Sequence, residues 1–298
     1  MDLNLLVAFE ALYRERNVTR AGRRLGLSQP ATSAALGKLR AAFGDPLFVK
    51  TPRGLEPTER CDALAGPIAR ALGDLRDAVG EEDFDPKTSD RIFRIGAVDP
   101  VLAVLAPALV ANVFAEAPNA RLDLRAIAPG TAPLLLDARE IDLAIAPIPS
   151  IPRHTSSVDL FTITLLVTVR PDHPLSKQPS AEELAEFPHA VVVLEGVART
   201  PVDDALAASG LARRVGVVVS SFLAIPDILA SSDAVALLPA PFARKLEREG
   251  RVRCAPVPKE LAPEPRKMKM VWPARTDGSP AWKWLRDHVV AVSRTLRA

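Results

Sequence analysis

The chain has 298 residues, a formal net charge of +2, an apolar fraction of 48 % and two cysteines. This length predicts about two to three domains with a large core and excludes intrinsic disorder. The two cysteines, Cys61 and Cys254, exclude a disulfide framework and a four-thiolate zinc site. Four scattered histidines leave little for a metal centre, so we expect neither a metal nor a cofactor. The balanced total charge argues, at first sight, against nucleic-acid binding.

The N-terminal segment, MDLNLLVAFEALYRERNVTR, lacks the basic region, the unbroken apolar stretch and the cleavage site of a secretory signal. The most apolar segments, such as VLAVLAPALVANVFAEAP, are broken by prolines and polar residues. None reaches the ~20 uninterrupted apolar residues of a membrane span. We therefore expect a soluble, cytoplasmic protein with no membrane partner.

Charge is distributed unevenly along the chain. Residues 1–60 hold ten Lys and Arg against six Asp and Glu, whereas residues 61–298 hold twenty-eight against thirty. Between Arg14 and Arg53, nine basic residues meet only Glu15 and Asp45. A charge run alone is as typical of a solvated helix face as of a nucleic-acid-binding surface. The local structure that carries the charge must therefore decide between the two.

The first sixty residues predict three helices. Leu5, Phe9 and Leu12 recur on one face of the first helix. A second, short helix is expected to begin at Thr19 as N-cap and to end at Gly26, where a left-handed residue is favoured. A third is expected to run from the cap at Ser28 to about Phe43, with Pro30 in its first turn. Its inner side is formed by Leu36, Leu39 and Phe43, and its outer side by Gln29, Ser33, Gly37 and Arg40.

Two short helices, a turn that contains glycine and a longer helix make a helix-turn-helix. The side chains of Gln29 and Ser33 can donate and accept hydrogen bonds at base edges in the major groove. After the third helix, residues 47–49 predict a short strand and residues 52–54 a turn. This wing places Lys50 and Arg53 for phosphates or a minor groove.

The run from Leu5 to Thr58, which includes SQPA-x-S and FGDPLF, resembles the winged helix of the LysR-type transcriptional regulators. The resemblance implies that Gln29, Pro30 and Ser33 face double-stranded operator DNA, with Lys50 and Arg53 at its backbone or groove. The candidate DNA-contacting residues are Ser28, Gln29, Pro30, Ser33, Gly37, Arg40, Lys50 and Arg53.

Two residues depart from the family's usual pattern. Gly22 stands where alanine is usual, and glycine costs a helix interior up to ~1 kcal/mol. Thr32 stands where valine or isoleucine is common; we interpret it as a core residue whose hydroxyl bonds back to a carbonyl one turn earlier. We expect a softer but functional DNA-binding domain.

A connecting helix follows, with Thr58 as its N-cap. Its apolar seam, at heptad-like spacing, consists of Leu64, Ile68, Leu72, Leu75 and Val79. Such a seam can pack on its own domain or form a dimer coiled coil, and the narrow stripe favours the dimer. In the family the linker helix pairs antiparallel, so a two-fold dimer would present two recognition helices. Residues 80–90, GEEDFDPKTSD, are expected to form a hinge.

From Ile92 onward, strands alternate with helices, which predicts βαβ units and a mainly parallel sheet. Strands are expected at RIFRIGAV, RLDLRAI, DLAIAPI, FTITLLVTV, AVVVL, VGVVVS, AVALLP and MKMVW. In the family this body is a two-lobe α/β effector domain of the periplasmic-binding-protein type, crossed near residues 160 and 266. The resemblance includes EIDLAIAP, DHPL and WKWLRDH and therefore covers essentially the whole chain.

The expected organisation has three parts. Residues 1–57 form the winged helix-turn-helix, 58–87 the linker helix and hinge, and 88–298 the effector domain. Within that domain, lobe I comprises residues 88–162 and 266–298, and lobe II residues 163–265.

Ligands of open α/β folds bind at the carboxyl ends of strands, against helix N-termini. Asp99, Thr131 and Thr200 are expected to cap such helices, and Arg199 beside Thr200 would suit an anionic group. A purely structural cap, or a surface arginine paired with Glu195, is the alternative for each. The candidate effector-binding residues are Val98, Asp99, Pro100, Thr131, Phe161, Ile163, Arg199, Thr200, Phe222 and Ile225.

Neither a nucleotide-binding loop, a CxxC pair, an HExxH motif nor a nucleophile elbow occurs in the sequence. We therefore expect no catalytic residues and no enzyme. The sequence predicts a LysR-type regulator whose DNA binding or bending is switched by a small, aromatic or anionic effector between the lobes. Expected partners are operator DNA, the effector, further copies of the chain in a dimer or tetramer, and RNA polymerase. The alternative is a cytoplasmic solute-binding or interaction protein with a vestigial helix-turn-helix.

Overall fold

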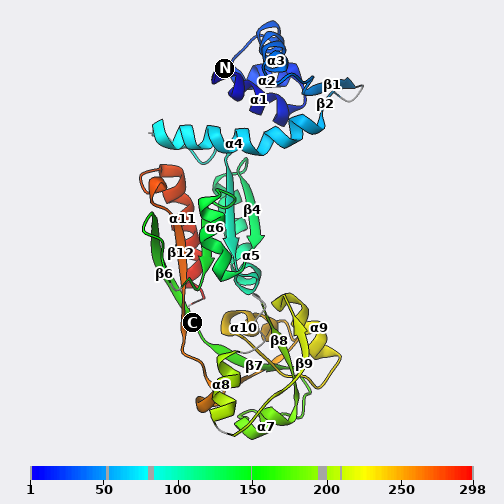
Figure 1. Cartoon of the computed structure of the whole chain (residues 1–298), viewed down its shortest axis with the longest axis vertical. Coiled ribbons are helices and arrows are strands. Elements are labelled where there is room, and N and C mark those ends of the chain that lie inside the picture. Colours follow the sequence, from blue (N-terminus) through cyan, green and yellow to red (C-terminus); the bar gives the residue numbers. More distant parts are fainter. Residues whose placement is uncertain are drawn as a thin grey trace. The chain divides into compact units, whose positions relative to one another are not determined.

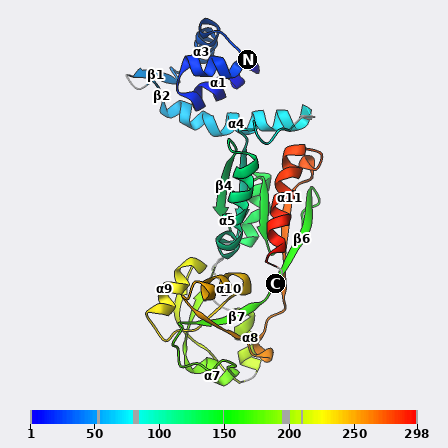
Figure 2. The same ribbon diagram turned by 180° about the vertical axis from the view of Figure 1, so that it is seen from behind.

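The computed structural model describes residues 2–51, 54–79, 84–148, 150–193, 200–208 and 210–296. These residues form two compact units, Met1–Glu82 and Asp83–Ala298 (Figure 1). The second unit consists of two lobes, one around β4 and β12 and the other around β7 and β8 (Figures 1 and 2).

The first unit is a helix-turn-helix with a wing and a long helix. Its elements are α1 (Asn4–Glu15), α2 (Val18–Leu25), α3 (Gln29–Phe43), β1 (Phe48–Thr51), β2 (Gly54–Pro57) and α4 (Glu59–Val79). The wing strands β1 and β2 pair antiparallel. A common core joins α1, α3, α4 and the wing, and includes Phe9, Leu12, Leu39 and Phe48. This core fixes the position of α3 relative to the wing.

The ends of α2 and α3 follow from local hydrogen bonds. The prediction that Thr19 caps α2 is wrong: the Asn17 side chain accepts bonds from the backbone N–H groups of Thr19 (2.9 Å) and Arg20 (3.0 Å). Gly26, at a φ of 66°, ends the helix as predicted. The Ser28 hydroxyl oxygen accepts a bond from the Ala31 N–H (3.3 Å) and so caps α3.

The two departures from the family pattern complement each other. Thr32 is fully buried and donates its hydroxyl to the Ser28 carbonyl at 3.0 Å, as predicted. A Cβ atom on Gly22 would lie 2.7 Å from the Thr32 Oγ1 and 2.9 Å from the Leu27 carbonyl oxygen. Both distances are shorter than contacts between non-bonded heavy atoms allow. Glycine at position 22 therefore makes room for the threonine and for the turn between the helices.

Helix α4 is capped by Thr58, as predicted, since its Oγ1 accepts a bond from the Cys61 N–H (3.1 Å). The interpretation of its whole apolar seam as a dimer contact is wrong for the first turns. Ile68 and Leu72 are buried in the core of their own unit, where Leu64 also packs. Leu75, one turn further on, is 40 % exposed.

Lobe I contains a five-stranded sheet in the order β4-β3-β5-β12-β6. Its elements are β3 (Ile92–Ala97), α5 (Asp99–Glu116), β4 (Arg121–Ala126), α6 (Ala132–Asp137), β5 (Leu143–Ala146), β6 (Thr155–Ile163), β12 (Arg266–Pro273) and α11 (Pro280–Arg294). β3, β4 and β5 are parallel, whereas β12 runs antiparallel to β5 and β6. The carboxyl ends of the three parallel strands therefore share one edge of the sheet.

Lobe II is built from two sheets that a bridge between His189 and Val235 connects. Its elements are β7 (Leu165–Val169), α7 (Ala181–Glu186), β8 (Pro188–Val192), α8 (Pro201–Ala208), β9 (Arg214–Val219), α9 (Ile225–Ala230), β10 (Ala236–Pro239), α10 (Ala240–Arg248) and β11 (Arg253–Pro256). β8 and β9 are parallel, while β10 and β11 flank β7 antiparallel.

The chain passes between the lobes twice. The segment predicted as one strand, FTITLLVTV, is divided at Thr164 into the end of β6 and the start of β7. The chain returns to lobe I where β12 begins at Arg266. Each passage is therefore a short extended segment.

By length and composition alone, α5 could cross a membrane. Its buried side chains, among them Val101, Leu105, Leu109 and Val113, pack in the core of lobe I. Of the apolar window, 28 % is buried, so packing in lobe I accounts for one face of α5.

Candidate DNA-contact surface and effector cleft

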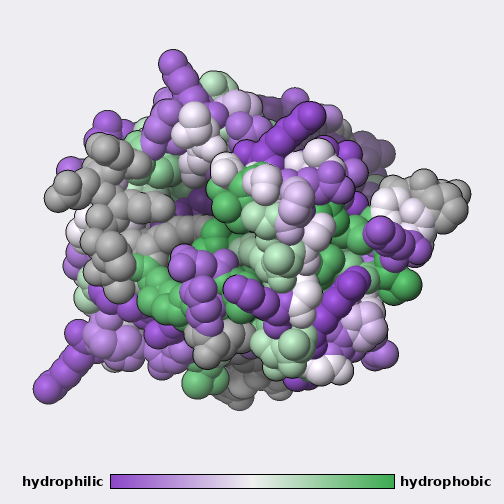
Figure 3. Space-filling model, turned by 90° about the horizontal axis from the view of Figure 1, so that it is seen from above, coloured by the Kyte–Doolittle hydropathy of each residue, from purple (hydrophilic) through white to green (hydrophobic). Residues whose placement is uncertain are grey.

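The outer side of α3 is exposed along its length. Ser28, Gln29, Pro30, Ser33 and Gly37 all lie on this surface. Figure 3 looks onto the end where α3 lies in Figure 1, and shows pale and green residues beside purple, hydrophilic ones. A polar helix face with small residues beside it suits close approach to base edges in a groove.

The predicted DNA contact Arg40 has other partners in the structure. Its Nε donates to the Pro46 carbonyl and its Nη2 to the Phe48 carbonyl, both at 2.8 Å. These bonds join the last turn of α3 to the first strand of the wing. Lys50 is exposed on β1, whereas Arg53 lies outside the described residues.

Part of the positive charge in this unit is compensated by Glu15. The Arg20 Nε lies 3.3 Å and the Arg24 Nη1 3.6 Å from its carboxylate. These two arginines of α2 pair with Glu15 at the surface. Arg23 on α2, Lys38 on α3 and Lys50 on the wing are further exposed basic groups.

In the second unit, Asp99 connects the two lobes. It is the first residue of α5 and not its N-cap, which is Val98, so the predicted cap is wrong. Its Oδ2 accepts hydrogen bonds from the Ser221 hydroxyl (2.6 Å) and the Phe222 N–H (2.9 Å), both in lobe II. Its Oδ1 is buried and has no hydrogen-bond partner among the described residues.

The predicted caps at Thr131 and Thr200 hold in part, and Thr131 occupies the N-cap position of α6 as predicted. Thr131 makes no side-chain cap bond, and its hydroxyl donates to the Ala128 carbonyl (2.9 Å). Thr200 donates its N–H (2.6 Å) and its hydroxyl (3.0 Å) to Asp203, which matches one half of the predicted capping box. Arg213 completes this cluster with bonds to both residues. Arg199 lies outside the described residues.

The remaining candidates are mostly packing residues. Val98 and Phe161 belong to the core of lobe I, and Ile163 packs against this core. Ile225 belongs to the core of lobe II, and Phe222 packs against it. Pro100 is buried in the first turn of α5. The structure thus brings together Asp99 and Phe222 across the lobes.

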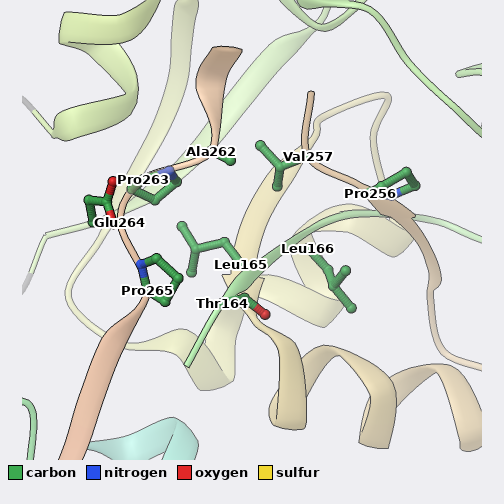
Figure 4. A pocket seen from close by; sticks show the side chains of 9 residues that line it. All are labelled: Thr164, Leu165, Leu166, Pro256, Val257, Ala262, Pro263, Glu264 and Pro265. Atoms are coloured by element: carbon green, nitrogen blue, oxygen red, sulfur yellow. The ribbon is translucent and has the colours of Figure 1, made fainter. Parts of the chain in front are cut away.

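Two hollows lie near the passages between the lobes. One of about 350 Å³ is surrounded by the start of β7, the end of β11 and the segment before β12 (Figure 4). Its lining is Thr164, Leu165, Leu166, Pro256, Val257, Ala262, Pro263, Glu264 and Pro265. The other, of about 420 Å³, is lined by Asp159, Leu160, Phe161, Thr162 and Lys267. Of the predicted effector residues, Phe161 borders a hollow.

The sequence prediction missed Ser221 and Arg213. Ser221 follows β9 and caps the short helix before α9, with its oxygen accepting from the Leu223 N–H. A serine after an apolar strand could have indicated it. Arg213 precedes β9 and carries no local signal, because its partners lie ten and thirteen residues earlier.

The comparisons with known proteins cover both units. Residues 87–294 match the LysR substrate binding domain, and residues 3–62 match the helix-turn-helix of bacterial regulatory proteins of the lysR family. The chain belongs to the LysR family of transcriptional regulators. It is therefore a regulator with a DNA-binding and an effector-binding domain, and not an enzyme.

Relatives of similar length support the assignment to the LysR family. The chain is 34 % identical to the HTH-type transcriptional activator NagR of Ralstonia sp. over 98 % of this chain and 97 % of that protein. It is 36 % identical to Nodulation protein D 3 of Rhizobium leguminosarum bv. phaseoli, over 99 % and 98 %. The crystal structure of a probable transcriptional regulator from Pseudomonas aeruginosa has 32 % identity and a TM-score of 0.69, and covers 97 % of this chain and 96 % of that one.

Membership of the LysR family confirms the predicted fold class, a winged helix-turn-helix and linker helix joined to a two-lobe effector domain. It also confirms that operator DNA and a small-molecule effector are partners of this kind of protein. The individual contact residues, the assembly and the chemistry of the effector belong to the proposals below. Among the described residues, no three His, Cys, Asp or Glu side chains form a group that could hold a metal.

Proposed function

We propose that this LysR-type regulator reads its operator through Ser28, Gln29, Pro30, Ser33 and Gly37, and tracks the DNA backbone through the wing. The exposure of these five residues on the outer side of α3 supports the assignment. Residues 1–57 would then bind DNA, 58–87 connect, and 88–298 sense the effector. We place the protein in the cytoplasm, where its DNA target lies.

A dimer through α4 would supply two recognition helices. Exposed Leu75 near the end of α4 is available for this contact, while the earlier part of the seam stabilises its own unit. A second self-contact, and with it a tetramer, is supported by apolar side chains at the surface of the effector domain. These are Val215, Val217 and Val218 on β9 and Phe114 on α5. RNA polymerase would be the further partner of the DNA-bound assembly.

The effector would act where Asp99 joins the lobes. Because Oδ2 accepts two bonds from lobe II and Oδ1 has no partner among the described residues, a ligand that donates a hydrogen bond would stabilise this carboxylate. A ligand anion would instead be repelled there. We therefore favour a hydroxylated aromatic molecule over an aromatic carboxylate. Its preference for one lobe arrangement would change the spacing of the recognition helices and the bending of DNA.

Thermal unfolding of the full chain with phenol, benzoate and a polyhydroxylated flavone as probes tests this proposal. A ligand at ~100 times its Kd stabilises the folded state by about 2.7 kcal/mol. We expect the hydroxylated probes to raise the Tm and benzoate to leave it unchanged. Asp99→Ala should abolish the shift and retain DNA affinity, whereas the control Asp172→Ala, at an exposed aspartate of lobe II, should keep both. A shift with benzoate alone, or one that survives Asp99→Ala, would refute the assignment.

A further inference from the structure

The wing of this regulator is a small element. β1 and β2 have four residues each and pair only with one another. An isolated two-stranded hairpin is marginally stable at best in water. Its position relative to α3 therefore comes from the buried side chains of Phe48 and Leu55 in the common core and from hydrogen bonds to the rest of the unit.

Two such bonds involve backbone groups that point out of the ribbon. On one side, the Leu55 N–H donates to the Arg16 carbonyl at 2.9 Å. On the other side, the Phe48 carbonyl accepts the bond from Arg40, whose Nε is bonded to the Pro46 carbonyl at the same time. The wing is thus held between the end of α1 and the end of α3.

The connection between α3 and β1 also depends on Arg40. It turns through Gly44, at a φ of 63°, and Leu47, at a φ of 57°. The Asp45 carboxylate accepts bonds from the Leu47 N–H (2.6 Å) and the Thr58 hydroxyl (2.7 Å), which closes the far side of this turn. On the other side of the turn, Arg40 donates a hydrogen bond to the Pro46 carbonyl.

We propose that Arg40 is a positioning residue that holds the wing against the recognition helix, so that both meet DNA in a fixed relative orientation. The planar guanidinium offers two donors in a rigid fork, and both are used on wing carbonyls. A lysine would keep the charge but not the fork. This role rests on the proposed DNA contact of the wing and replaces the simpler expectation that Arg40 contacts DNA directly.

The first test is amide hydrogen exchange of the free full-length chain. In Arg40→Ala and in Arg40→Lys, we expect the amides of Val49 and Glu56, which face each other in the wing, to exchange at least tenfold faster than in the wild type. The amides of Leu36 and Leu39 in α3 should not change. The matched control Lys38→Ala, which removes an exposed charge from the same helix, should leave wing exchange unaltered. Wild-type exchange in Arg40→Lys would overturn the proposal.

The second test is the salt dependence of binding to a duplex. Each phosphate contact contributes about −0.9 to the log–log slope, so losing one weakens binding roughly tenfold at 0.1 M salt. We expect Arg40→Lys to have a shallower log–log salt slope than the wild type, although it keeps the charge. The double variant Arg40→Lys/Lys50→Ala should have the same slope as Arg40→Lys alone. Additive losses from Arg40→Ala and Lys50→Ala, with a normal slope in Arg40→Lys, would instead make Arg40 a phosphate contact. If exchange rises but Lys50→Ala leaves the slope unchanged, the DNA contact of Lys50 fails and the positioning role stands.

Discussion

Replacing Arg213 with alanine is expected to destabilise the effector domain by about 3–5 kcal/mol, because it leaves a partly buried carboxylate without its charge partner. The Arg213 side chain is only 5 % exposed and that of Asp203 21 %. The guanidinium donates from Nε and Nη2 to the two carboxylate oxygens at 2.6 and 2.7 Å, and from Nη2 to the Thr200 hydroxyl at 3.0 Å. Urea unfolding of the full chain at pH 7 measures the loss.

Arg214→Ala is the matched control, since Arg214 is adjacent in sequence and exposed on β9. Its effect should stay within about 0.5 kcal/mol. The double variant Arg213→Met/Asp203→Leu should lose less than Arg213→Ala, because no unpaired charge remains. A loss below about 1 kcal/mol in Arg213→Ala would show that the ion pair between Arg213 and Asp203 does not stabilise the effector domain.

Acidification from about pH 6.5 to 4 is expected to remove about 3 kcal/mol of stability through His189 alone. Burial lowers the pKa of His189 to about 4, although the hydrogen bond with the Leu184 carbonyl opposes this. The Nε2–carbonyl distance is 3.0 Å, so Nε2 carries the proton of the neutral ring. Nδ1 is buried and has no partner among the described residues, so protonation there would leave a donor unsatisfied.

The sign follows from the proton count. Because the folded pKa lies below the unfolded value, the unfolded chain binds the proton first as the pH falls. Stability is therefore complete above about pH 6.5 and is lost as the pH falls towards 4. Unfolding in urea at pH 7 and 4.5 should show a smaller difference for His189→Gln than for the wild type. Equal differences in the two proteins would refute this role of His189.

The helix-turn-helix could be predicted from sequence because its signals are local. Gly26 and Ser28 mark the turn, and the apolar spacing marks the inner face of α3. The same locality explains why Thr32 was correctly placed in the core. Its fit with Gly22 could not be foreseen, because the two residues lie on different helices and meet only after packing.

The seam of α4 shows a different limit of sequence reasoning. A heptad-like spacing predicts that one face is covered, but it does not say by what. Ile68 and Leu72 are covered by their own unit. The same spacing is compatible with packing on its own unit and with a dimer contact. In lobe II, α10 and β11 were missed. β11 has four residues and ends in Pro256 at the edge of its sheet, where proline is tolerated but the strand signal is weak.

The candidate effector site could be predicted only in outline. The carboxyl end of β3 pointed to Asp99, and Phe222 was proposed as an apolar wall; the structure joins the two residues through a backbone hydrogen bond. That Asp99 uses its carboxylate for lobe II depends on a contact between residues 122 positions apart. No local pattern encodes such a contact. Arg213 was missed for the same reason, since its partners Thr200 and Asp203 lie thirteen and ten residues earlier in the chain.

The salt dependence of DNA binding tests the central claim, that the winged helix is a working operator reader, most directly. The full-length wild type should bind duplex DNA at low salt and lose affinity steeply as salt rises, with a slope near −0.9 for each phosphate neutralised. Gln29→Ala/Ser33→Ala should keep that slope and lose the preference for the operator over random duplex, because these side chains contact bases and not phosphates. Failure of the wild type to bind any duplex at low salt would contradict the account.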